Sequence, residues 1–152
     1  MTTARDIVST RVIVAMAAER LADVAGRMRA SAALHCVVNG RPGKFFGLVK
    51  LGDLLDCTSP GNRILADLVA AIRPVTVRPD EPAWAVAELI ERNRVYEVVV
   101  EEYSGEYAGL ITAESVLDWL VSEHRAAKAA PARGTGHTKD ARSFARPAHQ
   151  SP

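Results

Sequence analysis

The feature that constrains this chain most is an internal duplication. The segment 34–56, LHCVVNGRPGKFFGLVKLGDLLD, aligns without a gap with 96–118, YEVVVEEYSGEYAGLITAESVLD, at a constant offset of 62 residues. Valine pairs, glycines and a Leu-Asp step coincide in the two segments. Upstream the register drifts by one residue, and Asp6-Ile7 then matches Asp67-Leu68. Such self-similarity indicates that one supersecondary unit occurs twice.

Each copy is predicted to contain strand, helix, strand, strand and helix, in that order. Short apolar strands are expected at 12–14 and 75–77, and further strands at 34–38 and 45–49 around the turn residues 39–43. The first helix of each copy carries apolar residues at the i, i+3, i+4 and i+7 positions of one buried face. These residues are Leu21, Val24, Ala25 and Met28, and then Ala83, Val86, Ala87 and Ile90. The mixed order favours an α/β (α+β) fold in which helices cover small sheets.

Composition narrows the class of protein. The chain has 152 residues, of which 48% are hydrophobic, enough for one sizeable core. No run of about 18 apolar residues is present, so a membrane-spanning helix is not expected. The first residues do not resemble a secretory signal. The two cysteines, Cys36 and Cys57, are too few for a disulfide framework, and a reducing cytoplasm is the expected location.

Three segments are predicted along the chain: units at 4–60 and 61–124, and a disordered basic tail at 125–152. The tail is rich in Ala, Gly, Pro and Ser and carries six basic residues against one acidic residue. Its cations are spread out with little aromatic interleaving, so nucleic-acid binding is not expected. A solubilising extension is the simpler interpretation, and a weak, salt-sensitive nucleic-acid anchor is the alternative.

The segments GKFFGLVKLGDLL and GEYAGLITAESVL, with the linker ILADLVAAIRPVTVRPDEP between them, resemble a known family. This family is the paired cystathionine-β-synthase (CBS) domain, or Bateman module, and the resemblance covers roughly residues 4–122. It implies two β-α-β-β-α units packed as one module, assembled as a homodimer. It also implies a regulatory adenosine-containing ligand (AMP, ADP, ATP or S-adenosylmethionine) between the units, with no required cofactor, and a separate protein effector.

The family motif places a Ser or Thr and an Asp at the start of the last helix of each unit, where the Asp accepts hydrogen bonds from ribose hydroxyls. The first copy keeps the acid as Asp53 but has Lys50 at the Ser/Thr position, and Lys50 is a candidate phosphate contact. The second copy keeps Thr112 but has Ser115 at the Asp position, beside Glu114. The resemblance also implies, by strand position alone, base contacts at two residues. These are Ile13 and Thr76.

Each candidate residue also has a purely structural interpretation. Thr112 is suited to cap a helix, and an acid such as Asp53 is favoured in a first helical turn. His35 and Cys36 are adjacent on a strand and point to opposite faces, so no metal site is expected, and Cys36 is expected in the core. Trp84 and Trp119 fit either packing or dimer contacts. No recognisable Ser/His/Asp or Cys/His arrangement is present, so an enzyme is not expected.

Two functions remain open from the sequence. The first is a sensor that binds an adenosine-containing ligand and signals by a population shift to a partner protein. The alternative is a protein-interaction scaffold of the same fold that has lost the ligand. The incomplete motif in each copy is the main argument for the scaffold.

Overall fold

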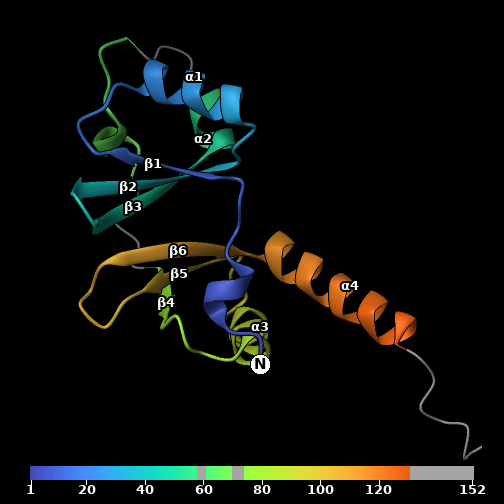
Figure 1. The fold of residues 1–152 in the computed structure, drawn as a ribbon. Helices are drawn as coiled ribbons and strands as arrows, with labels where there is room; N and C mark the ends of the chain where they lie inside the picture. Colours follow the sequence, from blue (N-terminus) through green and yellow to red (C-terminus); the bar gives the residue numbers. More distant parts are fainter. Residues whose placement is uncertain (58–60, 70–73, 131–152) are drawn as a thin grey trace, which may run out of the picture. The chain divides into compact units, whose positions relative to one another are not determined.

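The computed structural model describes residues 1–57, 61–69 and 74–130 and contains the predicted duplication (Figure 1). The first repeat consists of β1 (Val12–Met16), α1 (Leu21–Ser31), β2 (His35–Arg41), β3 (Lys44–Lys50) and α2 (Leu51–Leu55). The second consists of β4 (Val75–Val77), α3 (Ala83–Asn93), β5 (Glu97–Glu101), β6 (Tyr107–Thr112) and α4 (Ala113–Ala129). A short 3-10 helix precedes each repeat: η1 (Ala4–Ile7) and η2 (Leu65–Asp67). The predicted order of elements and the mixed α/β class are confirmed.

The chain divides into two compact units, Met1–Trp119 and Leu120–Pro152, and the boundary between them falls within helix α4. Its helical residues continue to Ala129. Residues 125–129, for which disorder was expected, are therefore helical. Residues 131–152 of the expected disordered tail lie outside the described residues.

Each repeat builds a three-stranded sheet with the same topology. In the first sheet β1 runs parallel to β2, and β2 runs antiparallel to β3. In the second, β4 is parallel to β5 and β5 is antiparallel to β6. The two hairpin turns contain Gly43 and Gly105 at φ values of +74° and +89°, a conformation that glycine adopts without steric cost.

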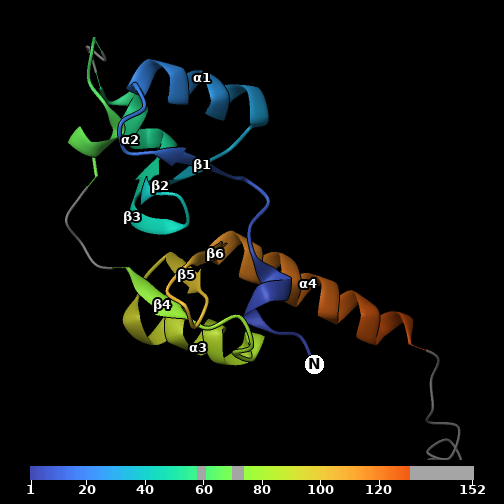
Figure 2. The ribbon, with the colours of Figure 1, turned by 60° about the vertical axis from the view of Figure 1, so that its left-hand side comes forward.

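One face of each sheet is covered by helices (Figure 2). The buried residues of α1 pack with Ala15, Cys36, Val38 and Val49 of the first sheet. Cys36 is fully buried, as expected, and burial raises the pKa of its thiol to about 11. In the second repeat, α3 packs in the same way against Val98, Val100 and Ile111. The period-3.6 pattern read from the sequence therefore identified the core faces of α1 and α3.

A third cluster of apolar side chains joins the two repeats. Its buried members are Val37 of β2, Val99 of β5 and Leu110 of β6, with Tyr107 packed against them. The backbone N–H of Tyr107 donates to the carbonyl oxygen of Gly43 at 3.0 Å, which links the two hairpins. Burial raises the pKa of the Tyr107 hydroxyl to about 12. Each sheet is thus covered on one face by helices and contacts the other repeat through its second face.

The segments that precede the two repeats are exchanged. Ala4, Ile7 and Val8 pack in the core of the second repeat. The backbone N–H of Ser9 donates to the carbonyl oxygen of Leu110 in β6 at 2.7 Å. In the same way, Leu65, Leu68 and Val69 pack in the core of the first repeat. Each repeat therefore completes its core with a segment that comes just before the other repeat in the chain.

The close approach of these segments explains one pair of glycines. Gly47 in β3 lies against the side chain of Val69, and the equivalent Gly109 in β6 lies against Val8. A Cβ atom at either glycine would overlap with the valine side chain. The two glycines coincide in the sequence repeat because both strands receive an exchanged segment at this point.

Candidate functional site

The first candidate site lies at the start of α2, where β3 ends. Lys50 is the N-cap residue, and its side chain cannot accept a hydrogen bond. Asp53 lies in the first turn, and its Oδ2 atom accepts the backbone N–H of Lys50 at 3.1 Å. The Asp53 side chain is exposed, so its carboxylate is accessible to a ligand while it stabilises the helix start. The structure thus brings Lys50 and Asp53 together.

The second candidate site lies at the start of α4 and has the same backbone arrangement with different side chains. The backbone N–H of Ser115 donates to Thr112 Oγ1 at 3.1 Å, which confirms Thr112 as the helix cap. In return, the backbone N–H of Thr112 donates to Ser115 Oγ at 3.0 Å. The Ser115 hydroxyl also donates to the Thr112 carbonyl oxygen at 3.0 Å. The Ser115 hydroxyl is thereby engaged within the helix start.

Glu114 is held by a residue from the other repeat. Its Oε1 atom lies 3.1 Å from Nη1 of Arg11, the residue before β1. Both side chains are about half exposed, at 51% and 53%. This ion pair directs the Glu114 carboxylate toward Arg11, and it adds a cation near the second candidate site.

A cluster of three charged or titratable side chains lies beside Lys50. Oε1 of Glu97 is 3.1 Å from Lys50 Nζ and 3.2 Å from Nε2 of His35. The side chains of His35 and Glu97 are only 15% and 16% exposed, whereas that of Lys50 is 49% exposed. The hydrogen bond from His35, and then that from Lys50, hold the pKa of Glu97 below its usual value.

Sequence reasoning missed this cluster because it treated His35 only as a possible metal ligand. A usable signal was present: His35 and Glu97 are 62 residues apart, which is the offset of the repeat. The two side chains therefore occupy equivalent positions, each at the first residue of its strand, and they meet between the repeats.

The two residues predicted from strand position lie on the first strand of each sheet. Ile13, in β1, is half-buried against the core of the first repeat. Thr76, in β4, is exposed and aligned with Val99 of β5. Their base contacts stay a prediction.

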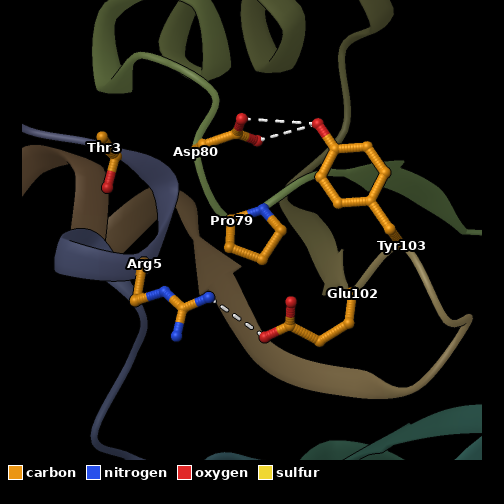
Figure 3. A pocket seen from close by; sticks show the side chains of 6 residues that line it. All are labelled: Thr3, Arg5, Pro79, Asp80, Glu102 and Tyr103. Atoms are coloured by element: carbon orange, nitrogen blue, oxygen red, sulfur yellow. Dashed lines mark hydrogen bonds and ion pairs between the residues drawn. The ribbon is translucent and has the colours of Figure 1, made fainter.

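A polar hollow of about 360 Å³ lies apart from all of these residues, near η1 and the turn of the second hairpin (Figure 3). It is lined by Thr3, Arg5, Pro79, Asp80, Glu102 and Tyr103. Arg5 Nη2 is 3.1 Å from Glu102 Oε1, and the Tyr103 hydroxyl donates to Asp80 at 3.2 Å. The charged groups of the hollow thus interact with one another, and it contains none of the predicted site residues.

Two further findings concern the described residues. Among them, no group of three His, Cys, Asp or Glu side chains is arranged to hold a metal ion. Nor does any helix within 1–57, 61–69 and 74–130 combine the length and apolar character needed to cross a membrane. Of the two tryptophans, Trp84 is 57% exposed, whereas Trp119 packs against the core of the second repeat.

The profile of the CBS domain matches residues 66–122. The CBS domain of a bacterial CNNM/CorC family Mg²⁺ transporter in complex with ATP is 25% identical, covering 79% of this chain and 87% of that chain, with a TM-score of 0.66. The CBS domain pair of protein MJ0100, in complex with 5′-methylthioadenosine and S-adenosyl-L-methionine, is 19% identical, with coverages of 80% and 98% and a TM-score of 0.67. CBSX2 in complex with AMP is 16% identical, with coverages of 82% and 99% and a TM-score of 0.67. A comparison with curated protein sequences gave no significant match.

Proposed function

Because residues 66–122 are a CBS domain and the chain has the fold of a CBS domain pair, we propose that it is a regulatory module that senses an adenosine-containing ligand. The ligand, which is AMP, ADP, ATP or S-adenosylmethionine, binds between the two CBS units. Binding shifts the population of two arrangements of the module and so alters its contact with a separate effector protein. The module is a non-catalytic homodimer that acts in the cytoplasm.

The observation that carries this proposal is the exposed carboxylate of Asp53 on a fold shared with ligand-bound CBS pairs. A carboxylate has two oxygens with about four acceptor positions, which suits the two neighbouring hydroxyls of a ribose. The hydrogen bond from the backbone of Lys50 to Oδ2 occupies one of these positions and fixes the side chain. Asp53 is therefore oriented before a ligand arrives, which reduces the entropy lost on binding.

The remaining candidates follow from this assignment. Lys50 contacts the phosphate end of a nucleotide, and Ile13 and Thr76 lie on the strands that contact the base. At the second site, Thr112 and Ser115 supply hydroxyl groups in place of a carboxylate. Glu114 and its partner Arg11 supply opposite charges there. We expect the site of Asp53 to bind more tightly, because the Ser115 hydroxyl already accepts the backbone N–H of Thr112 and has one acceptor position left for two ribose hydroxyls.

A ligand-free protein-interaction scaffold is the second candidate function. One observation favours it: the Ser115 hydroxyl and the Glu114 carboxylate already have partners within the chain. On this alternative, the helix starts serve only to stabilise α2 and α4.

The test is thermal unfolding of the full chain with AMP, ADP, ATP and S-adenosylmethionine, and with GTP as a control. A ligand at about 100 times its Kd stabilises the folded state by roughly 2.7 kcal/mol, which raises the Tm by several degrees. The matched variant is Asp53→Ser, because the equivalent Ser115 shows that a serine there still accepts the N-cap N–H. Sensing predicts a Tm shift that Asp53→Ser abolishes. The absence of a shift with every compound at millimolar concentration overturns sensing of these ligands and favours the scaffold.

A further inference from the structure

Resting on the function proposed above, we propose that protonation of His35 regulates the Lys50–Asp53 site. A protonated His35 neutralises Glu97 and releases Lys50, so that the site binds phosphate-bearing adenosine ligands more tightly in mildly acidic conditions than in alkaline ones.

The proposal starts from one shared oxygen atom. Oε1 of Glu97 interacts with both His35 Nε2, at 3.2 Å, and Lys50 Nζ, at 3.1 Å. When the imidazole is neutral, Lys50 is the only cation of the three groups and balances the carboxylate. Lys50 is then held by a counter-charge and attracts a phosphate group less strongly.

Adding a proton to the imidazole changes this balance. The three groups then carry two positive charges and one negative charge. His35 and Lys50 are aligned with each other across the β2–β3 ladder, so the two cations compete for one carboxylate and repel each other. The His35 side chain is 15% exposed and Lys50 is 49% exposed. Lys50 is the cation with access to solvent, and it is the one that leaves Glu97 for an incoming anion.

The other charged groups near this cluster have partners of their own. The backbone N–H of His35 donates to the carbonyl oxygen of Arg11 at 3.4 Å, and the guanidinium of Arg11 pairs with Glu114 on α4. Asp53 is tied to the backbone of Lys50. Among the side-chain types present here, only imidazole ordinarily changes its charge between pH 8 and pH 6.

The direct experiment is calorimetric titration of the full chain with AMP at pH 8 and pH 6. The control is His35→Gln, whose side-chain amide can donate the same hydrogen bond but does not titrate. Protonation of the AMP phosphate affects both proteins equally. The ratio of affinity at pH 6 to that at pH 8 should be about fivefold larger in the wild type than in His35→Gln, the scale of one partly exposed charge interaction. Equal ratios overturn the proposal.

A second variant tests the role of the carboxylate. Glu97→Gln removes the counter-charge of Lys50 at every pH. We expect Glu97→Gln to bind AMP more tightly than the wild type does at pH 8. Its affinity for AMP should then vary with pH only as far as the AMP phosphate itself is protonated. Unchanged affinity at pH 8 overturns the release of Lys50.

A ligand-free measurement separates failure of this proposal from failure of the sensor function. If neither the wild type nor Glu97→Gln binds AMP at either pH, the proposed binding of AMP is wrong. The regulation proposed here acts on that binding. The release of Lys50 is still tested by the NMR signal of its Cε group between pH 8 and pH 6. A signal that moves in the wild type and not in His35→Gln supports the release, and equal movement in both overturns it.

Discussion

The two repeats begin their last helices with the same backbone hydrogen bond but with different chemistry. In each, the third helical residue accepts the backbone N–H of the N-cap residue: Asp53 at 3.1 Å in the first and Ser115 at 3.0 Å in the second. The N-cap residues differ in a complementary way. Thr112 accepts a hydrogen bond in return from the backbone of Ser115, which Lys50 cannot do.

This comparison separates what the fold needs from what a ligand needs. The fold requires a hydrogen-bond acceptor at the third helical position, which either a carboxylate or a hydroxyl provides. It does not require a charge there. The charge of Asp53 in the first repeat therefore exceeds this requirement, and the proposed ligand site rests on that charge.

The largest loss of stability is expected at Gly47 and Gly109, where the two repeats carry the same residue. Alanine at either position should destabilise the protein by about 2–3 kcal/mol, because its Cβ atom would overlap with Val69 or Val8. Urea unfolding of Gly47→Ala and Gly109→Ala measures the loss.

The matched control for these variants is Gly52→Ala in α2, where a Cβ atom meets nothing within 4 Å. Adding Val69→Ala to Gly47→Ala should recover part of the lost free energy of unfolding. A loss in Gly52→Ala as large as in Gly47→Ala would show that the overlap is not the cause.

An intermediate loss of stability is expected at Glu97, whose equivalent position in the first repeat is His35. Its native pKa lies below the usual 4.5 because of His35 and then Lys50. Glu97 therefore contributes stability that is fully present above pH 4.5 and is lost as the pH falls through the native pKa. We expect Glu97→Gln to lower the free energy of unfolding by about 1 kcal/mol at pH 6.

Urea unfolding of wild type and Glu97→Gln at pH 6, 4.5 and 3 checks this prediction. The difference between the two proteins should shrink as the pH falls below 4.5. A difference that stays constant down to pH 3 would contradict a stabilising role for the ionised carboxylate.

The smallest effect is expected at the ends of α1 and α3. Both helices end on a left-handed residue that is not glycine: Ala32 at φ +54° and Arg94 at φ +51°. Glycine adopts this conformation without steric cost, so Ala32→Gly and Arg94→Gly should each stabilise the protein by about 0.5–1 kcal/mol. Calorimetric Tm values measure the gain, and a similar gain at both sites confirms that the ends are equivalent. Destabilisation at either site would argue against the left-handed cap.

Much of the fold was predictable because it depends on local patterns that occur in both repeats of the sequence. The strand at Val75–Val77 lies where it was predicted, and the helical periodicity located the buried faces of α1 and α3. The exchange of η1 and η2 was not predicted. Apolar residues such as Ile7 and Leu65 indicate burial, but their pattern does not say which repeat buries them.

The candidate site was predictable to a smaller extent. The cap at Thr112 follows from local chemistry, and the structure contains it. The contact between His35 and Glu97 depends on how two distant strands meet, and neither residue belongs to a motif. The sequence relates these two residues only through their equivalent positions in the repeat. That equivalence predicts a contact only once the two sheets are known to pack face to face.

The exchanged segments also bear on how the chain is made. Residues 2–9 leave the ribosome before either repeat, yet they pack with α3 and β6 of the second repeat, which are synthesised later. The first repeat receives Leu65–Val69 soon after its own strands have emerged. Synthesis therefore favours a fixed order of assembly, in which the first repeat forms early and the N-terminal segment waits for the final strand. Anything fused to Met1 is carried to the second repeat, not the first.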